Sequence, residues 1–149
     1  MQANYKSKNQ KHWIAVVSKE HTMRGVAGSF MQVCHGKQAP LKRMSKDDWM
    51  IVYSPKHTME GNEKLQSFTA IGQAVDDRVY QFQMTPSFVP FRRNMKFYDC
   101  EEISILPLID QLDFIQDKKK WGFKFRFGFF EINERDFKLI KSKMIHEEK

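Results

Sequence analysis

The chain has 149 residues, of which 41% are hydrophobic and 29% are charged, as is typical of one soluble domain with a substantial core. Its 25 lysines and arginines against 18 aspartates and glutamates give a net charge of +7, which favours polyanionic partners without identifying one. Two cysteines and no apolar run of about 20 residues argue against a disulfide-rich secreted protein and against a membrane protein.

The charge is distributed unevenly along the chain. Residues 1–64 carry +6, residues 65–117 carry −4 and residues 118–149 carry +5. If the two basic ends meet in space, they form one positive face. Residues 1–11 are polar, lack the apolar core of a signal peptide and are expected to be frayed or disordered. We therefore expect a cytoplasmic protein with a single domain over residues 12–149.

Two buried strands are predicted in the first third of the chain. The apolar run HWIAVVS at 12–18 is typical of a buried strand. Residues 21–33 are predicted to be partly helical, although two glycines weaken the helix. Residues 34–44 contain glycine and proline and are predicted to form a basic loop. The run WMIVYS at 49–54 is the second buried strand, ended by Pro55.

The middle of the chain adds further extended segments. Partial alternation predicts a third strand at 65–75, and after a turn at 76–77 a fourth strand is expected at 79–84. Residues 88–98 are predicted to be extended, and Pro107 should precede a short helix. Short helices between strands, without regular alternation, predict a β-rich α+β domain rather than a doubly wound parallel sheet.

The stretch KKKWGFKFRFGFFEI at 118–132 has a strong period of two. Aromatic residues alternate with cationic residues and glycines, and they are Trp121, Phe123, Phe125, Phe127 and Phe129. We predict a strand with a mostly buried aromatic face, apart from Trp121, and a cationic face. That cationic face is either simply solvated or available to a polyanion. Asn133 should then cap a final helix with Phe137, Ile140 and Met144 on one side.

Five segments in this order resemble the EVE-domain family of the PUA-like superfamily, which also contains the YTH domains. They are HWIAVVSKEH at 12–21, HGKQAPLKRMSKDDWMIVYSPK at 35–56, LQSFTAIGQAVDD at 65–77, PFRRNMKFYDC at 90–100 and WGFKFRFGFFEI at 121–132. The resemblance covers residues 12–144, and the compact single-domain chain is similar to the bacterial branch of the family. It implies an α+β, PUA-like mixed β pseudobarrel with short helices packed around it. It also implies a pocket at the barrel mouth that, in related domains, accepts a modified base flipped from DNA or RNA.

Such a pocket needs flat apolar walls, because stacking contributes ~1–3 kcal/mol per base. The candidate walls are Trp13, Trp49 and Trp121. Trp13 and Trp49 begin buried strands, so the alternative for both is an ordinary place in the core. Trp121 precedes Gly122, which permits a close approach of the backbone.

Polar groups near strand ends are the candidates for reading a base edge. The resemblance to YTH domains, in which polar groups just after the first strand read the base, points to Ser18 and Lys19. It also places Tyr53 and Ser54 at the corresponding end of the second strand. The loop containing His35 and Gly36 is a further candidate. The alternatives are serines that merely end strands and a capping or surface histidine.

Basic residues outside the pocket are candidates for phosphate contacts, which give affinity and salt dependence without sequence specificity. We assign this role to Lys37, Arg92, Lys124 and Arg126. Other cations that could join them are Lys42, Arg43, Arg93, Lys118, Lys119 and Lys120. The segments 35–46, 92–96 and 118–126 should then converge around the pocket mouth. A merely solvated surface is the alternative for each cation.

The sequence contains no convincing catalytic or metal-binding constellation. Side chains of neighbours such as Cys34 and His35 usually diverge, and the pairs Asp76-Asp77 and Glu101-Glu102 are turn-like. The five histidines and two cysteines lack metal-ligand spacing, so no metal or cofactor is expected. We predict a module that binds nucleic acid, DNA or RNA, and captures one base without chemistry. The alternatives are a pocket for a free nucleoside or other small molecule, and a nucleotide-processing enzyme.

Overall fold

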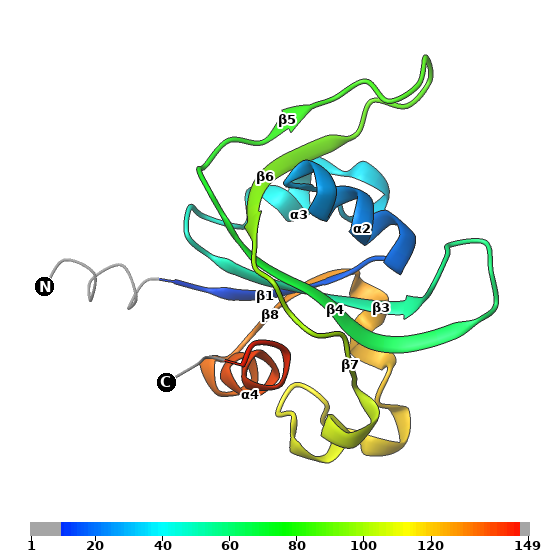
Figure 1. The fold of residues 1–149 in the computed structure, drawn as a ribbon, viewed down its shortest axis with the longest axis vertical. Helices are drawn as coiled ribbons and strands as arrows, with labels where there is room; N and C mark the ends of the chain where they lie inside the picture. The colour runs from blue at the N-terminus through cyan, green and yellow to red at the C-terminus, as the bar shows by residue number, and fades with distance from the viewer. Residues whose placement is uncertain (1–9, 147–149) are drawn as a thin grey trace, which may run out of the picture.

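A curled, mixed β-sheet forms the centre of the computed structural model, which describes residues 10–146 (Figure 1). Within that part of the chain the sheet has eight strands, of which six follow the order β2-β6-β4-β3-β1-β8. The other two pair at its margins, β5 with β6 and β7 with β4. The strands are β1 (His12–Val16), β2 (Phe30–Met31), β3 (Trp49–Lys56), β4 (Lys64–Ala74), β5 (Tyr80–Gln81), β6 (Phe91–Phe97), β7 (Ile103–Ser104) and β8 (Phe129–Ile132).

Short helices cover both sides of this sheet. α2 and α3 lie on one side, and α4 and η2 lie on the other (Figure 1). The α-helices are α2 (Lys19–Gly28), α3 (Gln38–Lys42) and α4 (Glu134–Met144). The 3₁₀ helices are η1 (Cys34–Gly36), η2 (Leu106–Gln111), η3 (Lys118–Lys120) and η4 (Phe123–Phe127). The curled sheet with its helices forms a half-barrel.

β1 lies between β3 and the edge strand β8. It pairs in parallel with β3, with Ile14 opposite Ile51, and antiparallel with β8, with Ile14 opposite Phe130. β3 and β4 form a long antiparallel hairpin with register shifts after Val52 and after Ser54. Shifts of this kind bend and twist the strands, which is how a sheet curls toward a barrel.

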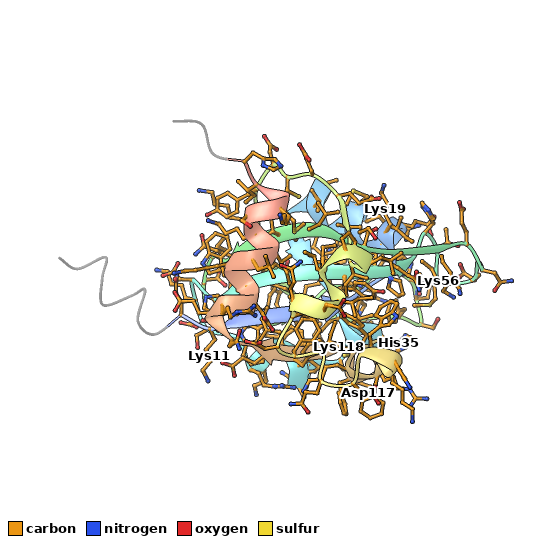
Figure 2. The ribbon with its side chains drawn as sticks, turned by 90° about the horizontal axis from the view of Figure 1, so that it is seen from below. Lys11, Lys19, His35, Lys56, Asp117 and Lys118 are labelled. Atoms are coloured by element: carbon orange, nitrogen blue, oxygen red, sulfur yellow. The ribbon has the colours of Figure 1, made fainter. Side chains whose placement is uncertain are left out.

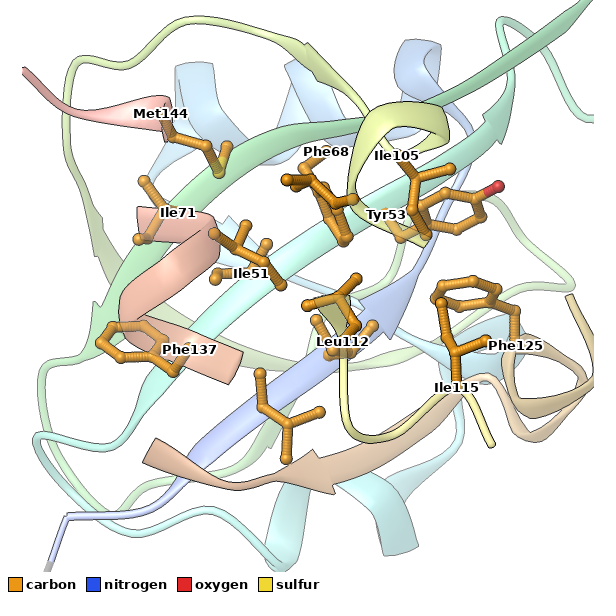
Figure 3. Packing of buried hydrophobic residues seen from close by; sticks show 14 of the residues in the cluster. Ile51, Tyr53, Phe68, Ile71, Ile105, Leu112, Ile115, Phe125, Phe137 and Met144 are labelled. Atoms are coloured by element: carbon orange, nitrogen blue, oxygen red, sulfur yellow. The ribbon is translucent and has the colours of Figure 1, made fainter. Parts of the chain in front are cut away.

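Alternate residues of the strands fill two hydrophobic layers. Ile14 and Ile51 face the layer closed by α4 and η2, where Figure 3 shows Phe137 and Leu112 packed over the sheet. Trp13 and Met50 point to the opposite side and join the layer under α2 and α3. Because side chains alternate along a strand, one short apolar run serves both layers. This explains why 12–18 and 49–54 are almost continuously apolar.

Several predicted elements are confirmed. β1, β3 and β4 lie where the strands at 12–18, 49–54 and 65–75 were expected, although β3 continues through Pro55 to Lys56. Pro55 is tolerated because it sits at one of the register shifts, where a missing N–H breaks no regular ladder. The side chain of Asn133 accepts a hydrogen bond from the Asp136 N–H at 2.8 Å and caps α4 as predicted.

Other elements differ from the prediction. The expected loop at 34–44 contains η1 and α3, and the expected strand at 79–84 is reduced to β5. Residues 1–9 of the predicted frayed N-terminus lie outside the described residues. The described Gln10 and Lys11 are held, because the Gln10 side chain donates to the Asp47 carbonyl and the Lys11 N–H donates to the Asp48 carboxylate.

The prediction of one continuous strand at 118–132 is wrong. The chain forms η3 and η4 first, and only Phe129–Ile132 enters the sheet as β8. Gly122 has an αR conformation and Gly128 has φ 77°, and each lies at an end of η4. Gly128 permits the left-handed turn that ends η4, whereas the αR backbone of Gly122 is accessible to any residue. Phe125 is therefore buried at 8% exposure, whereas Phe123 and Phe127 are 55% and 60% exposed.

Between residues 10 and 146 no helix is long and apolar enough to cross a bilayer.

Candidate functional site

A cavity of about 660 Å³ lies where the ends of β1 and β3 meet the start of α2, segment 30–37 and the turn before β8. Apolar side chains that include Val16, Val17 and Met31 contribute to its lining. Met84 and Phe88 from the loop between β5 and β6 border it, as do Arg126, Phe127 and Gly128. Its volume is within the ~300–1,000 Å³ that small-molecule pockets usually have.

The charged groups that line this cavity are all basic. The lining contains Arg24, Lys37, Lys56 and Arg126, and also the imidazoles of His21 and His35. Among the described lining residues there is no aspartate or glutamate. Figure 2 shows Lys56 and His35 toward the end of the molecule away from Lys11. A concave, partly apolar surface lined by one sign of charge concentrates anions.

Phenylalanine side chains form the aromatic part of the walls. Phe30, Phe88 and Phe127 line the cavity, and the last two are 39% and 60% exposed. Arg92 supports Phe30 from outside the cavity, with its guanidinium 3.7 Å from the ring centroid. Flat rings with open faces are suited to stacking against another planar group.

Ser18 supplies an unpaired hydroxyl at the cavity. The residue is 8% exposed, lies immediately before α2 and lines the cavity. Its side chain does not cap the helix, and Oγ has no hydrogen-bond partner within the described chain. A buried polar group without a partner costs ~1–3 kcal/mol. A ligand atom that bonds to Oγ would recover part of that cost.

The loop at η1 is held in an unusual backbone conformation. Cys34, His35 and Gly36 all have positive φ, at 50°, 62° and 83°. The amides of Gly36 and Lys37 both donate to the Val33 carbonyl, at 2.9 and 3.3 Å. Left-handed backbone is unfavourable for the two non-glycine residues, and at position 36 a Cβ would lie 2.5 Å from the Pro90 Cβ. This tight turn places His35 and Lys37 at the cavity.

Cys34 lines the same cavity. Burial raises the pKa of its thiol, although the positive charges of Lys37 and Arg43 act in the opposite direction. The thiol is therefore protonated at neutral pH and is a weak nucleophile. Within residues 10–146, no group of three or more histidine, cysteine or acidic side chains is placed to hold a metal ion.

Five predicted site residues meet at the cavity: Ser18, His35, Gly36, Lys37 and Arg126. They come from the end of β1, from η1 and from η4, and folding brings these segments together. The expected convergence of basic segments 35–46 and 118–126 is seen at Lys37 and Arg126.

The structure places two of the proposed tryptophan walls in the core instead. Trp13 is 3% exposed, stacks on Phe129 with centroids 5.0 Å apart, and donates from Nε1 to the Asp48 carboxylate at 3.0 Å. Trp49 packs between Tyr98 and Phe137, at centroid distances of 5.4 and 5.1 Å. Neither lines the cavity, because both belong to strands whose faces are already covered.

Tyr53 and Ser54 are also turned away from the cavity. Tyr53 is 2% exposed and stacks on Phe125 at 3.9 Å, and its burial raises the pKa of its hydroxyl. Ser54 is fully buried, with its hydroxyl 2.7 Å from that of Thr69. β3 extends beyond both residues, so the end of this strand reaches the cavity only at Pro55 and Lys56.

Three predicted cations do not line the cavity and are engaged by other side chains. Lys19 forms an ion pair with Glu102 at 2.7 Å. Arg92 is 7% exposed, lies between the rings of Phe30 and Phe82, and donates to the Gln32 side chain at 2.6 Å. Lys124 lies over the ring of Phe130, 5.5 Å from its centroid.

Arg93, the neighbour of Arg92, is likewise not a surface charge. It is 1% exposed and donates to the backbone carbonyls of Leu41, Met44 and Asp76. The segment 92–96 therefore contributes no exposed arginine to a basic face.

Trp121 lies in a separate hollow. This second hollow has a volume of about 450 Å³ and is lined by Lys119, Lys120, Trp121, Gly122, Phe123 and Arg126. Arg126 lines both the cavity and this hollow.

Sequence reasoning missed several lining residues. Arg24 and His21 lie on α2, where nothing in their local pattern distinguishes them from solvated helix residues. Phe88 lies in a segment predicted only to be extended. The alternation at 118–132 singled out Phe127 as part of an aromatic face, but we predicted that this face would be buried in the core.

A curled mixed sheet of this topology, with short helices on both sides, is a PUA-like fold. The chain matches the family model described as the EVE domain over residues 11–143, and it therefore belongs to the EVE-domain family. Both conclusions agree with the resemblance of its five sequence segments.

Curated relatives of similar length support this membership. A UPF0310 protein of Mycolicibacterium vanbaalenii is 51% identical over 134 residues, covering 90% of this chain and 92% of the relative. The UPF0310 protein YdcG of Bacillus subtilis is 43% identical over 136 residues, covering 91% and 93%.

Solved structures share the fold at low identity. The N-terminal domain of Staphylothermus marinus McrB aligns with TM-score 0.56 and 10% identity, covering 90% of this chain and 94% of that domain. Rpa0253 from Rhodopseudomonas palustris aligns with TM-score 0.52 and 14% identity, covering 87% and 90%. These likenesses concern architecture alone.

Proposed function

We propose that this protein binds nucleic acid and holds one unpaired base, unmodified or modified, in the 660 Å³ cavity. The observation that supports this most strongly is the composition of the cavity wall. It combines aromatic faces with basic side chains and, among the described residues, lacks carboxylates. A nucleotide has the matching parts, namely a planar base and an anionic phosphate.

Each part of the lining has a role in this proposal. Phe127 and Phe88 stack on the base, and Ser18 Oγ and His35 contact polar atoms at its edge. Lys37 and Arg126 contact the phosphates on either side of the flipped nucleotide. The free cysteines Cys34 and Cys100 fit a reducing compartment such as the cytoplasm.

A free nucleoside is the less favoured ligand. The basic surface does not end at the cavity, because Lys119, Lys120 and Arg126 continue into the second hollow. A free nucleoside has no phosphate to use these charges, whereas a strand has one per nucleotide.

The experiment is a binding titration of short labelled DNA and RNA strands, with and without modified bases, at several salt concentrations. Phe127→Ala should weaken binding of the preferred base by ~1–3 kcal/mol and leave the salt slope unchanged, because it removes stacking alone. Lys37→Gln should weaken all sequences alike and reduce the slope by about 0.7, because it removes one phosphate contact.

Two exposed residues that line neither the cavity nor the second hollow serve as matched controls. Leu106 is 55% exposed on η2, and Lys143 is exposed on α4. Leu106→Ala and Lys143→Gln should leave both affinity and salt slope unchanged. Binding that is indifferent to the base and intact in Phe127→Ala would refute base capture and leave only a generic basic surface.

A further inference from the structure

We infer that the second hollow is a subsite for the nucleotide next to the captured one, so that residues 118–127, the basic segment, form a docking platform for single-stranded nucleic acid. This inference rests on the proposed function of the cavity. It assigns a role to the aromatic and cationic stretch whose strand prediction failed.

The two hollows share a wall. Arg126 lines both of them, with Phe127 in the cavity and Phe123 in the second hollow. The rings of Phe123 and Phe127 meet edge to face, with centroids 6.0 Å apart. A strand that places one base against Phe127 therefore has its neighbouring nucleotide within reach of Phe123 and Trp121.

The aromatic surface of the platform is open. Phe123 is 55% exposed, and the Arg126 guanidinium lies 5.6 Å from the centroid of its ring. Trp121 is half-buried, with its ring edge-on to Phe125 at 6.4 Å. Phe125 belongs to the core, so it anchors the platform while the flanking rings face outward.

The charges of the platform lack carboxylate partners. No carboxylate of residues 10–146 lies within ion-pair distance of Lys119, Lys120, Lys124 or Arg126. Elsewhere on the surface such pairs are formed, as between Arg135 and Asp113 at 3.2 Å. Lys118 is left out of this group because its ammonium already donates to the backbone carbonyls of Leu112 and Ile115. Four cations without a carboxylate partner among the described residues, next to exposed rings, complement a polyanion that also has planar groups.

Single strands satisfy both requirements. In a duplex the bases are paired and stacked on one another, so exposed aromatic rings cannot reach their faces. In a single strand the bases stack on aromatic side chains while basic groups follow the backbone. An acidic protein would use the cations but offers no regular series of planar groups for Trp121 and Phe123.

The test compares ligands that do and do not reach the platform. The probes are fluorescein-labelled 12-nucleotide DNA and RNA strands of mixed sequence, and the four unlabelled nucleoside 5′-monophosphates. Phe123→Ala should weaken binding of a 12-nucleotide strand about fivefold or more, and leave affinity for the monophosphates unchanged. Lys119→Gln with Lys120→Gln should reduce the salt slope for the strand by about 1.4. Leu106→Ala and Lys143→Gln are the matched controls.

A spectroscopic measurement gives a second readout that does not depend on mutant stability. A base stacked on Trp121 quenches its fluorescence, and Trp13 and Trp49 supply a background that lies outside both hollows. The 12-nucleotide strand should quench the emission of the native protein, whereas the monophosphates should not. In Trp121→Phe this quenching should be lost while strand binding is retained.

The outcomes separate the inference from the proposed function. If Phe127→Ala weakens strand binding while Phe123→Ala and the lysine variants do not, the cavity binds a base but the platform is not a subsite. If the native protein binds monophosphates but gains nothing from a longer strand, the inference is refuted in the same way. If it binds neither strand nor monophosphate at low salt, both are refuted.

Discussion

Two segments that border the cavity differ sharply in chemistry. The neutral arm, residues 81–91, contains no charged residue, whereas the basic segment contains five lysines and arginines and no acidic residue. Both expose aromatic rings, with Phe82 at 47% and Phe123 at 55%. Figure 1 shows the arm extending away from the sheet beyond β5 and β6. Similar apolar exposure thus occurs in two electrostatic settings.

The comparison indicates that exposed phenylalanines alone do not define a nucleic-acid surface. In the neutral arm, Phe82 is occupied by a protein cation, because the Arg92 guanidinium lies 3.9 Å from its ring centroid. In the basic segment, the Arg126 guanidinium lies farther from the Phe123 ring centroid, at 5.6 Å, and Arg126 lines both hollows, where a ligand can reach it. We therefore expect the strand to follow the basic segment, and the arm to contribute only the cavity wall at Met84 and Phe88.

The largest effect is expected at Arg93 in β6, the strand that follows the arm. The guanidinium of Arg93 ties α3 and the chain before β5 to β6 through three backbone carbonyls. Arg93→Met should lower the free energy of unfolding by about 3 kcal/mol, since buried acceptors lose their donor. Urea denaturation measures this loss, with the exposed Arg78→Met as a control that should change stability by less than about 0.5 kcal/mol. Equal stability of the two variants would show that the bonds of Arg93 to these three carbonyls do not stabilise the fold.

The next largest effect is expected on nucleic-acid affinity when a carboxylate is introduced in the basic segment or in the arm. Arg126→Glu should weaken binding of a 12-nucleotide strand by about 2 kcal/mol, because a charge-assisted phosphate contact is lost and replaced by repulsion. Met84→Glu should weaken it by about 1 kcal/mol, since it adds only repulsion. Titrations with strands and with monophosphates measure both.

Comparing the two ligands separates Arg126→Glu and Met84→Glu more clearly than the size of either effect. Arg126→Glu should harm the strand more than the monophosphates, because Arg126 borders both hollows. Met84→Glu should harm both ligands equally, because Met84 borders the cavity alone. Greater harm to the strand from Met84→Glu would place the strand on the arm instead.

Much of the fold could be predicted because its strands carry their own signal. Residues 12–18 and 49–54 are largely buried on both faces, so they are almost continuously apolar, and Asn133 caps α4 with its own side chain. The prediction failed at 118–127 because this segment forms the 3₁₀ helices η3 and η4, and the chain becomes extended only after the left-handed turn at Gly128. The sequence shows only that aromatic residues occur at every second position. They lie on one face of a strand only if the backbone is extended there.

The candidate site was only partly predictable. The glycine-containing loop at His35 is a local signal, and this loop does reach the cavity. Arg92 and Arg93 look like surface arginines in the sequence, but β6 directs one between two rings and the other to backbone carbonyls. Phe30 and Phe88 meet at the cavity from separate segments, and only the tertiary fold brings them there.

The smallest expected effect comes from adding a charge to the neutral arm. Gln83 is exposed and contributes to neither hollow, so Gln83→Lys changes the charge of the arm without altering the cavity wall. If the strand follows the basic segment, the added ammonium meets no phosphate. The salt slope for a 12-nucleotide strand should then rise by much less than the ~0.7 expected for one new contact. Gln83→Glu controls for the loss of the amide, and it should likewise leave the slope nearly unchanged. The opposite result would be a salt slope that rises by about 0.7 in Gln83→Lys and falls by a similar amount in Gln83→Glu. It would show that the nucleic-acid strand also crosses the arm, and that both segments bind it despite their different composition.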